Sequence, residues 1–267
     1  MLLKKYVLSF VLLCVCTPLF SQDCKVSDWD LMFMLGKKVQ SVVSETQVVS
    51  LATENQLGKE AYEKLSKQYV LRRKGKDFRK LNDIFQKLTV HCERKSLDYQ
   101  LFLIEDDTTV NAFSHAGGYV YLTTGLLLQL QNDDETALII GHELAHVDKK
   151  HCIRAYQMQL LKQKLQSEDA KLGADLLKQL IAPFDQFDEY DADWAASEYC
   201  IKAGYSPEKG MEIFKRWAQF ERPDETLKLF RTHPFSKDRV CFLVKYLNTY
   251  HPESEEVKAL KQKTNEK

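Results

Sequence analysis

The chain has 267 residues, of which 44% are hydrophobic and 28% charged, and its formal net charge is zero. This is the composition of an ordinary globular protein with enough apolar side chains for a core. It offers neither a basic field for nucleic acid nor an acidic, disordered composition, so we expect no nucleic-acid partner.

The first residues have the pattern of a secretory signal. Lys4 and Lys5 form a short basic region, and Tyr6 to Phe20 is a mostly apolar run of 15 residues, which is short for a membrane span. Ser21 follows as a small residue, so we expect residues 1–21 to be a cleaved signal peptide. The mature chain is then exported, to the periplasm or envelope or, alternatively, secreted. An uncleaved anchor is the lesser possibility, and peripheral membrane association stays open.

Cysteine usage leaves the redox state open. The mature chain retains five cysteines: Cys24, Cys92, Cys152, Cys200 and Cys241. None of them forms a C-x-x-C pair, and five is an odd number. One or two disulfides are possible in an oxidising compartment, and buried free thiols are as good an interpretation for some of them.

Helical patterns precede any strand. Residues 28–53 carry apolar side chains at helical spacing, and after a connection at 54–58 a second helix is expected from Lys59 to Val70. A third amphipathic helix is expected from Phe78 to Cys92. The basic run Arg72 to Lys76 is interpreted as a solvated turn.

The pattern then changes to strands. Tyr99 to Ile104 is apolar and aromatic and ends in acidic residues, which is typical of a strand and turn. Tyr119 to Thr124 predicts a second strand, and a short apolar helix is expected over Leu126 to Leu130.

The central motif is His142-Glu143-Leu144-Ala145-His146, the pattern H-E-x-x-H, on a predicted helix that Asn132 and Glu135 would begin as a capping box. Two histidines four residues apart lie on one helix face, so both imidazoles can bind one zinc ion. Glu143 projects from the same turn, beside the metal, where it can act as a general base toward a water molecule. We therefore expect one zinc ion per chain.

More helices are expected after this motif, at residues 153–181, 185–203, 207–220 and 237–250. The sequence from Pro252 onward is a polar tail. No internal repeat or low-complexity linker occurs, so residues 22–267 are predicted to form a single domain.

A catalytic zinc needs a third protein ligand and one open position. In one class of H-E-x-x-H proteases a nearby histidine supplies it, but those positions here are Lys149 and Cys152. His151 comes five residues after His146, about 140° round the same helix, so it is not expected to join the metal. The third ligand must therefore come from later in the chain.

Glu189 is the best candidate for that ligand. It shares a helix face with Asp193, four residues on, so that one carboxylate can bind zinc while the other orients a ligating imidazole. Most other glutamates on predicted helices, such as Glu168, Glu198 and Glu208, are interpreted as surface charges.

Four groups of residues occur in a recognisable order between about Tyr99 and Leu247. They are Val110-Asn111-Ala112-Phe113 with Gly117-Gly118-Tyr119 and Thr124-Gly125-Leu126-Leu127; Glu135 through His142-Glu143-Leu144-Ala145-His146 to His151 and Arg154; Glu189-Tyr190-Asp191-Ala192-Asp193; and Thr232-His233-Pro234 with Arg239. In these the chain resembles the zinc metallopeptidases that include the CAAX prenyl protease, the bacterial HtpX and BepA proteins and mitochondrial Oma-type proteases.

The resemblance implies an α+β, mostly helical fold, a zincin core of the minigluzincin type with a small sheet beside the zinc helix. It implies His142, His146 and Glu189 as zinc ligands and Glu143 as the general base. His233 would lie near the metal, either as an oxyanion donor or as a fourth ligand. The implied substrate cleft, where a peptide can add as an extra strand, is bordered by Asn111, Ala112, Phe113, Gly117 and Gly118.

The function implied is that of a zinc-dependent endopeptidase acting on protein or peptide substrates, in envelope protein quality control. The alternative is a zinc-bound binding or chaperone-like protein with a closed, latent site. The sequence departs from the family at Ser114-His115-Ala116, where His115 is interpreted as a cleft-rim or turn residue. It also lacks the membrane helices and the helical-repeat domain of some branches.

Overall fold

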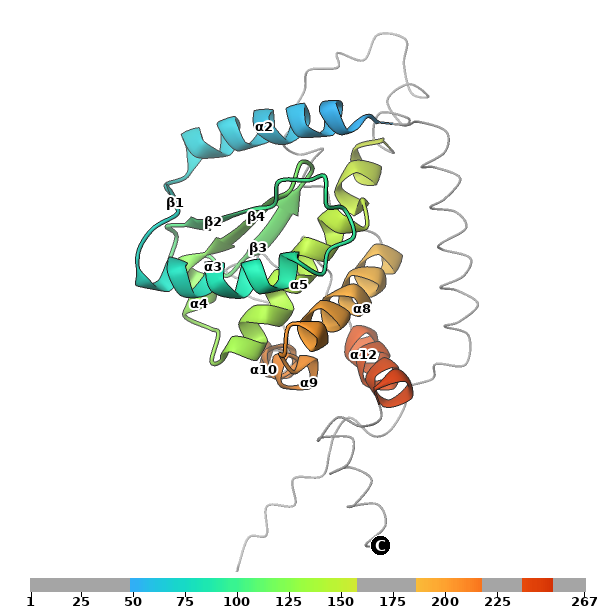
Figure 1. The fold of residues 1–267 in the computed structure, drawn as a ribbon. Coiled ribbons are helices and arrows are strands. Elements are labelled where there is room, and N and C mark those ends of the chain that lie inside the picture. Colours follow the sequence, from blue (N-terminus) through green and yellow to red (C-terminus); the bar gives the residue numbers. More distant parts are fainter. Residues whose placement is uncertain (1–48, 158–185, 218–236, 252–267) are drawn as a thin grey trace, which may run out of the picture.

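The computed structural model describes residues 49–157, 186–217 and 237–251 (Figure 1). Several predictions concern residues outside these ranges and are not tested by the structure: the signal peptide, residues 28–48, most of the helix at 153–181, His233 and the tail from Pro252. No described helix is both long and apolar enough to cross a membrane.

A four-stranded sheet lies beside the helix that carries the central motif. Its strands are β1 (Leu71–Arg72), β2 (Gln100–Ile104), β3 (Ala112–His115) and β4 (Tyr119–Thr123), arranged in the order β1-β2-β4-β3. β2 and β4 are parallel, and the outer strands pair antiparallel to their neighbours. With the helices around it, this sheet confirms the predicted α+β, mostly helical, zincin-like fold.

Two of these strands were not expected. β1 has only two residues, and its second residue, Arg72, begins the basic run that was interpreted as a turn. That interpretation is therefore partly wrong. β3 contains alanine, serine and histidine, whose preference for strands is weak, and pairing with β4 decides its conformation. His115 is accordingly the last residue of a strand and fully buried, so its interpretation as a turn or rim residue is wrong.

Both faces of the sheet are covered by helices (Figure 1). Leu101 and Leu103 of β2 join the main core with α3 (Lys76–Thr89), whereas Phe102 and Ile104 join a second, aromatic cluster under α2 (Leu51–Gln68). Side chains of a strand alternate between faces, so a strand that is apolar throughout is what two covered faces require.

Helix α2 begins eight residues before the predicted Lys59, and the interpretation of residues 54–58 as a connection is wrong. The Ser50 hydroxyl caps the helix by accepting a hydrogen bond from the backbone N–H of Thr53. Gly58 lies inside the helix because α2 passes close over the turn after β3. A Cβ atom there would lie 2.3 Å from the carbonyl oxygen of Ala116.

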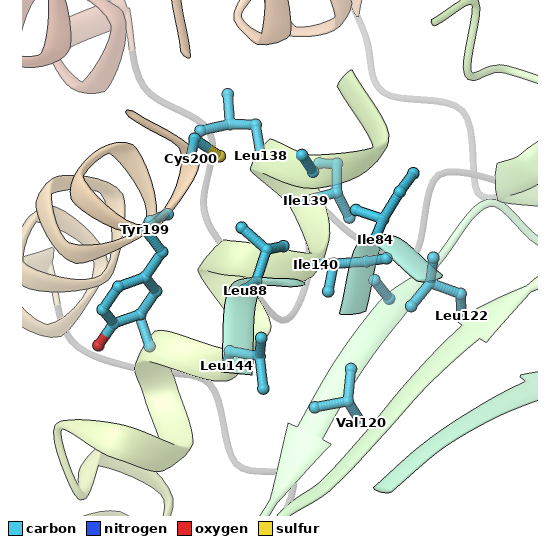
Figure 2. Close-up of a cluster of buried hydrophobic side chains, with 14 of the residues drawn as sticks. Ile84, Leu88, Val120, Leu122, Leu138, Ile139, Ile140, Leu144, Tyr199 and Cys200 are labelled. Atoms are coloured by element: carbon cyan, nitrogen blue, oxygen red, sulfur yellow. The ribbon is translucent and has the colours of Figure 1, made fainter. Parts of the chain in front are cut away.

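The central helix, α5 (Asp133–Asp148), is buried along nearly its whole length. Figure 2 shows its residues Leu138, Ile139, Ile140 and Leu144 packed in one cluster with Ile84 and Leu88 of α3, Leu122 of β4 and Tyr199 of α8 (Gln186–Lys202). Asn132 caps α5 as predicted, since its side chain accepts from the N–H of Glu135. The capping box is only half formed, because the Glu135 carboxylate accepts from Gln131 N–H and pairs with Arg216 instead.

The remaining helices are α4 (Thr124–Leu127), α8 (Gln186–Lys202), α9 (Pro207–Gly210), α10 (Glu212–Trp217) and α12 (Lys237–Tyr250). α4 was expected two to three residues later, and the helix predicted over residues 207–220 is divided into α9 and α10 at Gly210, a residue that ends helices readily. α12 has the predicted bounds.

Asp148, at the end of α5, ties three segments of the chain together. Its carboxylate accepts hydrogen bonds from the backbone N–H groups of Glu93 and Arg94 at 2.8 Å and from the hydroxyls of Tyr99 and Tyr199 at 2.9 and 2.6 Å. The carboxylate is buried. It therefore fixes the end of the central helix against the loop before β2 and against α8.

Replacing Asp148 by alanine should lower the free energy of unfolding by about 2–4 kcal/mol, because four buried donors lose their acceptor. Urea denaturation of the two proteins measures this difference. Asp107→Ala removes an exposed aspartate and should stay within about 0.5 kcal/mol of the parent. Equal stability of the two variants would contradict the role given to Asp148.

Candidate metal centre

The site is built by α5 and α8, which lie side by side in Figure 1. Their facing positions are occupied by small residues, and a Cβ atom on Gly141 would lie 3.4 Å from Ala196. Small side chains let two helices approach closely. A carboxylate on α8 can therefore reach the histidines of α5.

Three buried side chains place possible metal-binding atoms together: His142, His146 and Glu189, whose donor atoms lie within 4.8 Å of one another. The two Nε2 atoms are 3.0 Å apart, and the Glu189 carboxylate lies 3.4 Å from His142 Nε2 and 3.5 Å from His146 Nε2. Donors at about 2.0–2.1 Å from a tetrahedral zinc would be about 3.3–3.4 Å apart. The three groups thus fit a metal ion with two nitrogen donors and one oxygen donor.

Asp193 lies behind the first histidine of the motif. Its Oδ1 is 2.9 Å from His142 Nδ1, so it accepts from the ring nitrogen that faces away from Glu189. Asp193 also forms a bidentate pair with Arg239 of α12, through Nε and Nη2, at 2.7 and 2.6 Å. Burial raises the pKa of the Asp193 carboxyl, but Arg239 and His142 outweigh it and lower that pKa below its ordinary value.

Arg239 is a site residue to which the sequence assigned no role. Its Nη1 lies 2.6 Å from Glu189 Oε2, so one buried guanidinium holds the carboxylates of Glu189 and Asp193. Arginine is suited to this because its planar fork carries five donors. Arg239 lies far along the sequence from residues 189–193, so local spacing could not predict this contact. The one signal for a role of Arg239 was its place in the fourth group of family residues.

His151 is the second residue that sequence reasoning missed. It was placed on the same helix as His146, pointing away, and this is wrong because α5 ends at Asp148 and the chain turns at Lys150, which has a φ of 63°. His151 then begins a new helical segment and its Nδ1 lies 3.0 Å from His146 Nδ1.

Glu143 is fully buried on α5, next to His142. His142 and His146 retain 4% and 0% of their exposure, and Glu189 retains 1%. These four side chains are therefore nearly or fully buried.

The residues expected to border a cleft fall into two groups. Asn111, Ala112 and Phe113 lead into and start β3, the edge strand that lies next to α5. Gly117 and Gly118 instead form the turn between β3 and β4, with φ values of 86° and 96°. Glycine adopts positive φ values without steric cost, so the geometry of this turn is sufficient to explain why both positions are glycine.

The charge state of His142 couples metal binding to pH. Burial lowers the pKa of His142, but hydrogen bonds and charge from Asp193 and Glu189 outweigh it and raise that pKa to about 9. Since this pKa lies above the ordinary value of 6.5, His142 in the metal-free protein carries a proton on both ring nitrogens, and hence a positive charge, at neutral pH. A metal must displace one of these protons.

The stability of the metal-free protein should consequently fall as the pH rises. A raised pKa in the folded state contributes stability in full below about pH 6.5 and loses it as the pH passes about 9. We expect a loss of at most about 3 kcal/mol over this window. Thermal melting in excess chelator measures it, with His142→Asn as the control that lacks the slope. Parallel curves for the two proteins would contradict this coupling.

Comparison with known proteins agrees with this arrangement. The chain is 26% identical over 182 residues to "Beta-barrel assembly-enhancing protease" of Escherichia coli, and the alignment covers 60% of this chain and 37% of that protein. It is 26% identical over 176 residues to "Metalloprotease LoiP" of Escherichia coli, covering 60% and 67%. It is 28% identical over 143 residues to "Mitochondrial metalloendopeptidase OMA1" of Arabidopsis thaliana, covering 51% and 29%.

The chain thus spans little more than a third of the length of the assembly-enhancing protease. The match to the family itself is broader and runs over residues 75–247, which include β2, β3 and β4 of the sheet, α5, α8 and most of α12. All three groups of the metal centre lie within it. The chain therefore belongs to Peptidase family M48.

Proposed function

We propose that this protein is a zinc-dependent endopeptidase that cleaves protein or peptide substrates. The observation that carries the proposal is the meeting of His142, His146 and Glu189 in one buried cluster, with Glu143 on the same helix as the two histidines. Two imidazoles and one carboxylate are the ligands of a catalytic zinc that keeps an open position. Family membership supports this reading over a zinc-bound binding protein.

The chain's own residues then have defined tasks. A bound zinc ion would polarise the scissile carbonyl and the attacking water. Glu143 takes the proton from that water and passes it to the leaving amine. Asp193 holds the His142 ring in position, and Arg239 holds Asp193 and Glu189. His233 lies outside the described residues, and we propose that it acts at the same centre as an oxyanion donor or a fourth ligand.

The register of β3 indicates how a peptide could bind beside the metal. The carbonyl of Asn111 accepts from the N–H of Thr123, so Asn111 bonds toward β4. Bonding alternates along an antiparallel pair, so Phe113 also bonds toward β4, opposite Tyr121. The backbone groups of Ala112 and Ser114 then point to the other edge, with which no described strand pairs.

We propose that this edge of β3 binds the substrate backbone as an added strand. The amide oxygen of Asn111 supports this, because it is buried and has no hydrogen-bond partner among the described residues. A group of this kind needs an explanation, and a substrate N–H would supply one. Ala112 and Ser114 are themselves buried, so a peptide can reach them only after this side of the molecule opens.

Export of the mature chain is part of the proposal. The basic and apolar N-terminal pattern supports a signal at residues 1–21, and residues 22–267 would then form one catalytic domain. Cys241 is disulfide-bonded, whereas Cys92, Cys152 and Cys200 are buried free thiols. A disulfide persists in an oxidising compartment, which supports the periplasm, the envelope or secretion. Quality control of envelope proteins fits the name of the E. coli relative, a beta-barrel assembly-enhancing protease.

The catalytic role of Glu143 can be separated from metal binding. Glu143→Gln keeps the volume and a hydrogen-bonding tip but removes the base, so zinc should stay bound while peptide turnover falls by at least about two orders of magnitude. Glu189→Ala should lose zinc and turnover together, because it removes a ligand. Metal analysis and cleavage of a casein-type substrate on the same preparations give both quantities.

The outcomes are distinct. Full turnover by zinc-loaded Glu143→Gln, free of contaminating proteases, would falsify the mechanism. Unchanged zinc content in Glu189→Ala would show that the ligand assignment is wrong. A parent protein that binds zinc and cleaves nothing would favour the closed, latent alternative.

Export makes a prediction of its own. Protein recovered from the envelope or the medium of an expressing bacterium should begin near Gln22, which N-terminal sequencing reads directly. Replacing Lys4 and Lys5 by glutamate should reduce the exported fraction, since signals depend on their basic region. A membrane-bound product that retains Met1 would instead identify an anchor.

A further inference from the structure

We infer that His151 is a positioning residue of the metal centre: it accepts a hydrogen bond from His146 and so holds that ring with Nε2 directed at the metal. The inference rests on the proposed function in one respect, that His146 is a metal ligand. It concerns a residue outside the H-E-x-x-H motif and the ligand set.

The hydrogen positions follow from the distances. His146 Nε2 is the nitrogen that faces the other donors, at 3.0 Å from His142 Nε2 and 3.5 Å from Glu189 Oε1. A ligating nitrogen carries no proton, so the proton of the neutral His146 ring is on Nδ1. That nitrogen lies 3.0 Å from His151 Nδ1, which must therefore be the acceptor.

The same reasoning fixes the tautomer of His151. If its Nδ1 accepts, its Nε2 carries the proton and donates. The Asp191 Oδ2 atom lies 3.1 Å from that nitrogen and accepts the hydrogen bond. A single direction of donation thus runs from His146 through His151, and Asp191 at the outer end selects the tautomer of His151 that can accept.

Local backbone geometry brings His151 to this position. Because α5 ends at Asp148 and Lys150 adopts a left-handed conformation, the helical segment that starts at His151 has a new direction. The rings of His146 and His151 have centroids 5.0 Å apart and planes at 73°. Both side chains are fully buried, so bulk water does not compete for the hydrogen bond.

The two histidine ligands are thereby supported in different ways. His142 donates directly to the carboxylate of Asp193, whereas His146 donates to a neutral imidazole that in turn donates to Asp191. Groups that orient a ligating histidine typically change metal affinity by about 10–100-fold when they are removed. We expect an effect of that size at His151.

A pair of variants of equal shape separates the hydrogen bond from packing. Asparagine and leucine have the same branched outline, but only asparagine places an acceptor oxygen one bond beyond Cγ, as histidine does with Nδ1. His151→Leu should weaken zinc binding by about 10–100-fold, and His151→Asn by less than about tenfold. Affinity is measured by competition with a chromophoric chelator, and folding by the melting of the metal-free variants.

His115→Leu is the matched control. His115 is also a fully buried histidine, but it bonds to Tyr121 and the Ala116 carbonyl within the sheet and is not part of the metal cluster. Its replacement should leave the zinc affinity unchanged even where it lowers the melting temperature. Cobalt-loaded proteins add a spectrum, which should change in His151→Leu and not in His115→Leu.

A measurement on the unaltered protein avoids any loss of folding. In the zinc-loaded chain, nitrogen NMR should show His146 protonated on Nδ1 and His151 protonated on Nε2. The opposite tautomer of His151 would overturn the inference, as would equal zinc affinities of the asparagine and leucine variants. A parent chain that binds no zinc would contradict the proposed function itself, and so would be recognised separately.

Discussion

The packing of α8 against α5 is the contact on which the rest of the site depends. The two histidines belong to one helix and would be neighbours in any helical conformation, but the Glu189 carboxylate reaches them only if the helices come close. Gly141 faces Ala196 at that contact, and Ala192 and Ala195 are buried with it. Larger side chains there would separate the helices and increase the distance between the nitrogen donors and the carboxylate.

Such a centre concentrates charge among buried side chains, and arginines pair with three of its carboxylates. Arg239 binds Glu189 and Asp193, and Arg154 binds Asp188 at 2.6 Å. Removing one partner of a buried pair leaves an uncompensated charge, which costs about 3–5 kcal/mol. Breaking this polar network would thus destabilise the contact between α8 and α5, and α12 is held to the site through Arg239.

The local patterns of the sequence predicted most of what is local in the structure. Helical spacing and the cap at Asn132 located α5, continuous apolar and aromatic runs located β2 and β4, and α12 has its predicted bounds. Errors occur where distant contacts decide the conformation. Gly58 lies inside α2, where the sequence indicated a connection, because the helix passes close to the turn after β3, and β3 exists because it pairs with β4.

The same division applies to the site. The spacing of His142 and His146 is a property of one helix and can be read from the sequence, and the pair Glu189 and Asp193 follows the same rule. Arg239 could not be found in this way, because it reaches the centre from another helix. The orientation of His151 was predicted wrongly because helical geometry was extended past Asp148. The residue types around Lys150 do not predict its left-handed backbone conformation.

The burial of the centre has a consequence for catalysis. The ligand side chains, Glu143 and the backbone of β3 are all nearly or fully buried, yet a polypeptide must contact both the metal and a strand edge to be cleaved. Access of the substrate backbone to these groups is therefore a requirement of the proposed reaction, distinct from the chemistry at Glu143. A substrate or partner that preferentially binds a conformation in which these groups are accessible would accelerate cleavage without any change in the catalytic groups.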